Sequence, residues 1–141
     1  MAAQLSWYLD DHVLYLNLQG IVTPETLSKI CDSALEILST RNRPVHLIID
    51  AQKAASLPTE SGPLRNSMTK LLAHKYVGWS VMVTHNLMFQ AIMNRMVHGL
   101  TDRWGYVGSL SEAADTIHRT NVYLPSIPSS SPNSTLIAQA R

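Results

Sequence analysis

The sequence predicts one α/β domain with a mixed, mostly parallel sheet of about five strands and about four helices, in two layers or as a sandwich. Apolar runs of strand length alternate with segments whose apolar residues repeat every three or four positions. The acidic pair Asp10-Asp11 separates two strand-like runs, 4–9 and 13–18, as a hairpin turn does. The 141 residues, 45% of them hydrophobic, suffice for one sizeable core. We therefore expect an opening antiparallel hairpin followed by helices alternating with parallel strands.

The first helix and the central strand have clear start and stop signals. Thr23 supplies a capping hydroxyl before Pro24, and proline fits the first helical position because no N–H is needed there. Pro44 ends this helix, since proline disfavours helical geometry in the residue before it. The branched apolar run Val45–Ile49, closed by Asp50, predicts a strand that is buried on both faces.

The second half of the chain repeats the alternation of helices and strands. A loop of about ten small or polar residues is expected after the central strand, and then a helix whose apolar residues Leu64, Met68, Leu71 and Leu72 have helical spacing. Residues 79–84 predict a buried strand, and the weakly charged segment Leu87–Leu100 predicts a helix. A short strand is expected at 106–107, before a last helix capped by Ser111.

The end of the chain changes in composition. Residues 124–141 (LPSIPSSSPNSTLIAQAR) are rich in Ser, Pro and Asn. Such a segment buries too little apolar surface to offset the entropy of ordering it. We expect a domain at 1–123 and a flexible tail at 124–141.

Composition and charge exclude several classes of protein. The formal net charge is +1 and the basic residues are scattered, so we expect no nucleic-acid partner. The single cysteine, Cys31, lies in an apolar helical pattern and favours a core thiol in a reducing cytoplasm. The sequence has no apolar run of about 18 residues and no secretory leader pattern, so a soluble cytoplasmic protein without a membrane span is expected.

The loop after the central strand is the first candidate for a site. In a sheet of parallel strands, ligands and partners usually meet the fold at the carboxyl ends of the strands. Purely structural roles are the alternative to partner binding. Asp at the end of a strand often accepts hydrogen bonds from the loop backbone, and Ser or Glu before a helix often only stabilises the start of that helix. The candidate partner-binding residues are Asp50, Lys53, Leu57, Thr59, Glu60, Ser61, Gly62 and Leu64.

The methionine-rich segment Leu87–Leu100 is the best sequence signal for association. Its apolar arc is wider than one core-facing stripe requires, so part of it is expected to serve a dimer contact or a ligand groove. Methionine adapts to irregular surfaces, which suits either use. The candidate residues are Met88, Ile92, Met93 and Met96.

No pattern predicts catalysis, a metal or a cofactor. The six histidines are dispersed and lack the close spacing of metal ligands. No G-x-S-x-G elbow supports a serine nucleophile. We expect a protein that is not an enzyme and has no metal site.

Several of these features together resemble the STAS domain, the fold of anti-sigma-factor antagonists of the SpoIIAA type. The resemblance covers roughly residues 4–120. It rests on the strand ending at Asp50, on Ser61-Gly62 at the start of the next helix, and on SLSEAADTI at Ser109–Ile117, which is similar to the S-L-x-E-A-L motif of that family. It implies a regulatory module that binds an anti-sigma-like or kinase-like protein. A homodimer is expected from the apolar arc of Leu87–Leu100, because symmetric pairs are the commonest closed assemblies.

The resemblance also shows a departure at the phosphoacceptor. Phosphorylatable members begin the helix with D-S-x-G, and alignment on Gly62 puts Thr59 at the aspartate and Glu60 at the acceptor serine. A carboxylate at that place takes no phosphate and puts a fixed charge near a helix N-terminus, where the macrodipole favours an anion. Ser61 and Ser56 remain candidate phosphorylation sites, although the resemblance carries no such role to them.

Two functions from different classes follow from the sequence. The first is a non-enzymatic, regulatory protein-interaction module that lacks the usual phosphoacceptor serine. The alternative is a small-ligand module with an apolar pocket between the methionine-rich helix and the sheet, taking a lipid-like or nucleotide-like molecule.

Overall fold

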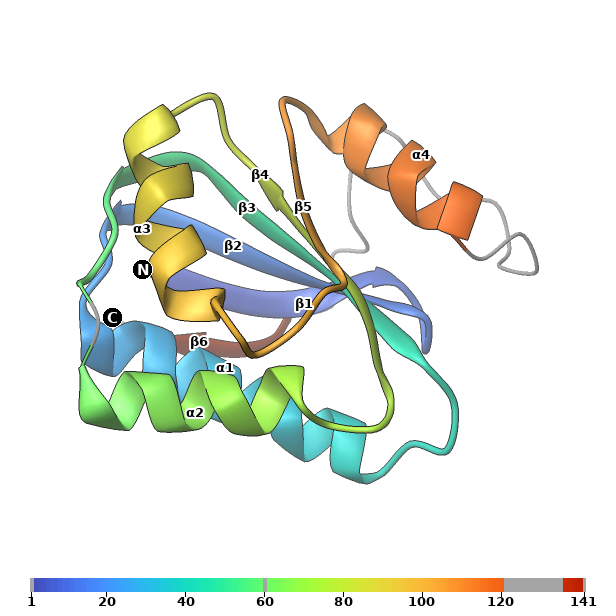
Figure 1. Ribbon diagram of the computed structural model, residues 1–141. Helices are drawn as coiled ribbons and strands as arrows, with labels where there is room; N and C mark the ends of the chain where they lie inside the picture. The colour runs from blue at the N-terminus through green and yellow to red at the C-terminus, as the bar shows by residue number, and fades with distance from the viewer. Residues whose placement is uncertain (1, 60, 121–135, 141) are drawn as a thin grey trace.

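The protein is an α/β sandwich in which helices cover both faces of a mixed sheet (Figure 1). The computed structural model describes residues 2–59, 61–120 and 136–140. Within them the sheet has six strands in the order β5-β4-β3-β2-β1-β6, with four helices. The strand pairs from β2 to β5 are parallel, so the predicted mostly parallel α/β fold is confirmed, with one strand more than expected.

The chain opens with the predicted hairpin. Strands β1 (Ala3–Leu9) and β2 (Val13–Ile21) pair antiparallel. The turn between them needs a left-handed residue, and Asp11 adopts it with φ 64°. His12 N–H donates to the Leu9 carbonyl oxygen at 3.0 Å and closes the turn.

Two capped helices lie side by side on one face of the sheet (Figure 1). In α1 (Pro24–Ser39) the Thr23 hydroxyl accepts a hydrogen bond from Thr26 N–H at 3.2 Å, as the sequence predicts. In α2 (Gly62–Leu72) the Ser61 hydroxyl accepts from Leu64 N–H at 3.3 Å. Both helices direct apolar stripes at the sheet and form one continuous core with it.

The central strand is longer than predicted. β3 runs over Val45–Ser56, so the expected loop directly after Asp50 is wrong for residues 51–56. These residues have little apolar alternation, but β2 continues to Ile21 and offers them backbone partners. Val22 N–H also donates to the Ser56 carbonyl oxygen at 3.1 Å. The true loop is therefore short and starts at Leu57.

Strands β4 (Val77–Val83) and β5 (Trp104–Val107) complete the parallel part of the sheet. Between them α3 (Leu87–Val97) lies on the same face as α1 and α2. It ends three residues earlier than predicted, before Gly99 at φ 77°.

The last helix covers the opposite face. α4 (Leu110–Thr120) packs over a second cluster that includes Tyr15 and Ile48 (Figure 1). Its start is stabilised by Ser109, whose hydroxyl accepts from Glu112 N–H at 3.1 Å, and not by the predicted Ser111. Glu112 completes the cap by accepting from Gly108 N–H at 2.9 Å.

A sixth strand corrects the prediction of a flexible tail. β6 (Leu136–Ala140) pairs antiparallel with β1, with Ala3 opposite Ala140 and Leu5 opposite Ala138. The expectation is wrong for these residues because the edge of β1 supplies backbone groups that need partners. Residues 124–135 of the expected tail lie outside the described residues, and the boundary at 123 stays a prediction. No described helix is long and apolar enough to cross a membrane.

Candidate functional site

A groove opens between the loop before α2 and the outer side of α3, at the edge where the parallel strands end. It has a volume of about 360 Å³. Its described lining comes from one residue of the loop and three of α3: Thr59, Ile92, Arg95 and Met96. We call it the α3 groove. It lies at the place where parallel sheets usually meet ligands and partners.

The position of α3 is set at its start and along its body. Asn86 caps it, because its Oδ1 accepts from the N–H groups of Met88 and Phe89 at 2.9 and 3.2 Å. Tyr106 of β5 fastens the body of the helix, since its hydroxyl can donate to Asn94 Oδ1 at 2.7 Å or to the Gln90 carbonyl oxygen at 3.1 Å. The groove wall is therefore anchored to the sheet.

The two sides of α3 have different roles. Met93 and Met96 are buried against the sheet and the other helices, and Met96 also reaches the groove. Met88 is 70% exposed and Ile92 is half-buried. The wide apolar arc of the sequence therefore divides into a core side and an outer side.

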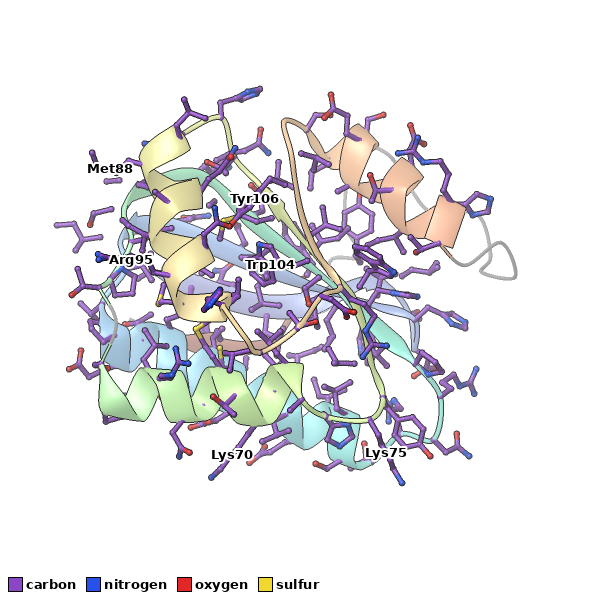
Figure 2. The ribbon with its side chains drawn as sticks, in the orientation of Figure 1. Lys70, Lys75, Met88, Arg95, Trp104 and Tyr106 are labelled. Atoms are coloured by element: carbon purple, nitrogen blue, oxygen red, sulfur yellow. The ribbon has the colours of Figure 1, made fainter. Side chains whose placement is uncertain are left out.

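The first turn of α3 extends the apolar surface beyond the groove. Leu87 is 77% exposed and precedes Met88. Met88, Ile92 and Arg95 follow each other at four- and three-residue spacing, which places them on one side of the helix. Figure 2 shows Met88 and Arg95 on this side, away from Trp104 and Tyr106. We call Leu87, Met88, Ile92 and Arg95 the outer α3 face.

Arg95 gives this face its charge. It is the only charged residue of α3, and it lies in the last turn, where the helix dipole favours a cation. The ion pair of Arg41 with Asp11, at 3.2 Å, does not involve Arg95. The sequence interpretation missed Arg95, although its spacing from Met88 and Ile92 is the signal that could have found it.

Asp50 does not belong to the groove. It is buried, and its Oδ2 accepts a 2.5 Å hydrogen bond from the Tyr15 hydroxyl under α4. Its Oδ1 accepts from Gln52 N–H and Gln52 Nε2 at 3.0 and 3.1 Å. Burial and this bond to Asp50 raise the pKa of the Tyr15 hydroxyl. Asp50 therefore has a structural role: its carboxylate holds the Tyr15 hydroxyl and both the backbone and the side chain of Gln52.

The other predicted loop residues separate into surface and core. Leu57 and Leu64 are buried among apolar side chains, where they support the loop, and a partner contact through them stays a prediction. Thr59, Lys53 and Gly62 are exposed, and of these only Thr59 lines the groove. Glu60 lies outside the described residues.

The two candidate phosphorylation sites have structural roles. The Ser61 hydroxyl is the cap of α2, and Ser56 ends β3 with its carbonyl oxygen bonded to Val22 N–H. Neither role tests phosphorylation, which stays a prediction.

A second hollow of about 260 Å³ lies at the start of α3. Its polar lining includes Gln52 within β3, Thr84 directly after β4, and His85 beyond it. His85 is packed against Gly108, where a Cβ would lie 2.6 Å from the imidazole Cε1. The Thr84 hydroxyl is already bonded, since it accepts from Asn86 N–H at 3.0 Å.

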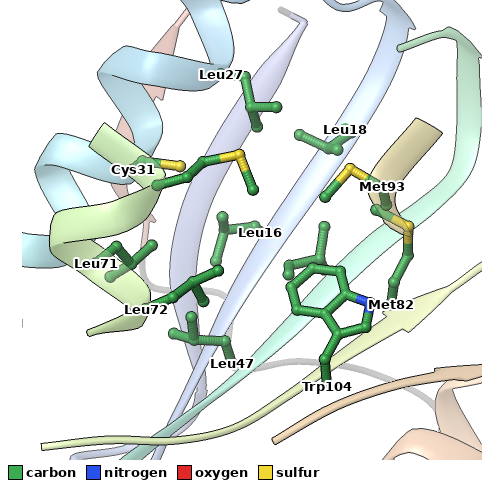
Figure 3. Close-up of a pocket in the computed structure, with 12 residues that line it drawn as sticks. Leu16, Leu18, Leu27, Cys31, Leu47, Leu71, Leu72, Met82, Met93 and Trp104 are labelled. Atoms are coloured by element: carbon green, nitrogen blue, oxygen red, sulfur yellow. The ribbon is translucent and has the colours of Figure 1, made fainter. Parts of the chain in front are cut away.

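The core encloses a small apolar cavity between α1, α2, α3 and the sheet (Figure 3). Its volume of about 30 Å³ is far below the roughly 300 Å³ or more of a typical ligand pocket. Cys31 borders it, and burial raises the pKa of this thiol to about 12. The predicted pocket thus exists beneath Met93, but it has no room for a lipid-like or nucleotide-like molecule.

Within the described parts of the chain, no three His, Cys, Asp or Glu side chains gather closely enough to hold a metal ion. The buried side chain of His46 has a structural role, because its Nδ1 accepts a hydrogen bond from Trp79 N–H at 2.9 Å. Burial, with Arg103 and His12 nearby, lowers its pKa to about 4.

Comparison with known proteins identifies the fold. No protein-family model matches the chain, and no curated protein matches it by sequence. A solved structure of the anti-sigma factor antagonist SpoIIAA in its unphosphorylated form is similar with a TM-score of 0.55 and 16% identity, over 83% of this chain and 98% of that one. The protein has a STAS/SpoIIAA-like fold.

A second solved structure with a SpoIIAA-like fold is also similar to this chain. It is an uncharacterized protein from Shewanella loihica, similar with a TM-score of 0.54 and 17% identity, over 82% of this chain and 91% of that one. The predicted resemblance is thereby confirmed at the level of fold. At this identity the likeness establishes the backbone arrangement of the SpoIIAA-like fold, so the chemistry of the α3 groove has to be derived from the side chains of this chain.

Proposed function

We propose that the protein is a non-enzymatic regulatory module that binds a partner protein at the α3 groove and the outer α3 face. The observation that carries this proposal is the exposure of Leu87 and Met88, 77% and 70%, directly beside the groove. Large apolar side chains that are exposed next to one another and rimmed by polar groups mark interaction surfaces. Burial against a partner would remove this apolar area from water.

The fold supports a regulatory partner by analogy. One structure with this fold is named as an anti-sigma factor antagonist, and its described form is unphosphorylated. We therefore propose an anti-sigma-like or kinase-like protein as the partner of a cytoplasmic regulator. Glu60 would supply a fixed charge at the position where the family carries its phosphoacceptor serine. This part of the proposal rests on fold analogy.

A photo-crosslinking amino acid at position 88, introduced in the native cells, tests the docking surface. We expect a specific protein adduct at Met88 and none at Lys75, which is exposed and lies far from Met88 in Figure 2. Loss of the Met88 adduct in an Ile92→Lys background would confirm that the groove takes part. The same adducts at both positions would contradict the proposal.

Self-association through α3 is the competing use of the same surface. A symmetric pair is the commonest closed assembly, and it would bury the outer α3 face of both copies. Met88→Lys is the suitable variant, because Met96 is only 2% exposed and its substitution would disturb the core. A dimer that sediments as a monomer after Met88→Lys would support this use.

The small-ligand function has weaker support. The enclosed apolar cavity is too small for the expected ligands, so such a molecule would have to occupy the open groove. Native mass spectrometry would reveal a co-purified ligand as a mass adduct. Repeated spectra of the bare chain would count against this function.

A further inference from the structure

We propose that the partner segment bound at the α3 groove is acidic: one carboxylate pairs with Arg95, and apolar side chains next to it pack on Ile92 and Met88. This inference rests on the proposed function and adds the chemistry of the partner.

The first step is the composition of the groove. Ile92 and Met96 supply its apolar surface, Thr59 brings a hydroxyl from the opposite side, and Arg95 is its only described charge. Arg95 is exposed, as are Met88 and Thr59. A segment lying along the outer α3 face therefore contacts the exposed side chain of Met88, then the half-buried side chain of Ile92, and then the guanidinium of Arg95.

The second step is the isolation of that charge. α3 contains no acidic residue, and the ion pair between Arg41 and Asp11 lies elsewhere in the structure. The guanidinium offers a planar pair of donors that matches a carboxylate in two parallel hydrogen bonds. Its attraction for an anion increases when a bound partner excludes water from the groove. An acidic side chain is thus the complement that this chain does not provide on α3.

The third step concerns a second copy of the chain as the occupant. Symmetric packing of α3 on α3 would desolvate both copies of Arg95, and neither helix carries a carboxylate to pair with them. A desolvated charge without a partner is costly. Charge complementarity therefore favours a different, acidic chain over self-pairing.

Selection of a phage-displayed library of random peptides on the full chain tests this inference. Selection is repeated on Arg95→Glu and on Lys70→Glu, which makes the same charge change on α2, away from Arg95 in Figure 2. All other charges stay constant in this comparison, including Glu60, which follows Thr59 in the chain. Binding of enriched peptides to Met88→Asp then maps them to the groove.

We expect the wild type and Lys70→Glu to enrich peptides with Asp or Glu next to large apolar residues, and Arg95→Glu to enrich Lys or Arg instead. An enriched acidic peptide should bind Arg95→Gln about fivefold more weakly, as for an exposed ion pair. Peptides that need Met88 but show no acidic preference would overturn this inference and leave the proposed function standing. Failure to enrich any peptide that needs Met88 would overturn both.

Discussion

Close packing between His46 and Gly78 shows how single side chains hold the parallel sheet together. A Cβ at residue 78 would lie 2.3 Å from His46 Nδ1. The same nitrogen accepts the hydrogen bond from Trp79 N–H, so the imidazole cannot move away without losing it. Position 78 therefore requires glycine for space, although its backbone has no positive φ.

We predict that Gly78→Ala lowers the free energy of unfolding by about 2 kcal/mol, because it overpacks a buried site. Urea denaturation measures the change. Gly62→Ala is the matched control, since no atom lies within 4 Å of a Cβ there, and it should change stability by less than about 1 kcal/mol. Equal stability of both variants would contradict the close packing.

His46 should also make the fold sensitive to acid. Its pKa is about 4 in the folded protein, against 6.5 for the ordinary side chain, so the unfolded chain binds the proton first. Stability is therefore complete above about pH 6.5 and falls as the pH drops toward 4, by up to about 3 kcal/mol.

The test is the difference between the wild type and His46→Asn, whose Oδ1 can still accept from Trp79 N–H. Denaturation curves from pH 7 to pH 4 should converge at low pH. A wild type and a variant that lose stability in parallel would show that His46 does not titrate in this window.

At the residue scale, the sequence predicts roles that depend on neighbouring residues in the chain, but not roles that depend on the folded groove. The caps by Thr23 and Ser61 and the anchoring role of Asp50 follow from local preference, and the structure confirms them. Arg95 was missed because a single cation forms no motif by itself, and its spacing from Met88 and Ile92 had no meaning without a groove beside it. Its importance comes from the groove, which forms only when the loop and α3 meet.

At the level of elements, α3 combines two functions in one helix. Its inner side completes the core, and its outer side presents apolar surface next to the groove. Periodicity in the sequence revealed the excess apolar arc but could not assign each methionine to a side. The length of β3 was also underestimated, since residues 51–56 are extended by their pairing with β2 and not by their own pattern.

Substitutions on the two sides of α3 should change the stability of the fold by different amounts. Met93→Ala should lower the free energy of unfolding by about 2 to 4 kcal/mol, because it leaves a hole next to an existing cavity. Met88→Ala should change it by less than about 0.5 kcal/mol. Chemical denaturation measures both, and a large loss from Met88→Ala would mean that the outer face contributes to the fold itself.

At the level of the whole molecule, β6 extends the sheet beyond β1 and becomes its outer strand. β6 covers β1, and Ala140 is buried in the core cluster. The fold class was predictable because the alternation of helices and strands is strong. The sixth strand was not, because a short LIAQA segment after a Ser/Pro-rich stretch has no signal until β1 offers an edge.

Truncation after Thr135 should expose that edge. We predict faster hydrogen exchange of the β1 amides that face β6 and a greater tendency to aggregate, since unpaired strand edges recruit other chains. The control is Gln139→Ala, which changes an exposed side chain and keeps the strand. Unchanged protection of β1 after truncation would show that β6 does not pair with it in solution.

The central claim is that the α3 groove and its outer face bind a partner protein. Native mass spectrometry of the protein purified from its own cells at low salt, as wild type and as Met88→Asp, tests it most directly. We predict a complex with a different protein for the wild type and the bare chain for the variant. A wild type that appears only as a monomer, or with only a small-molecule adduct, would contradict the account.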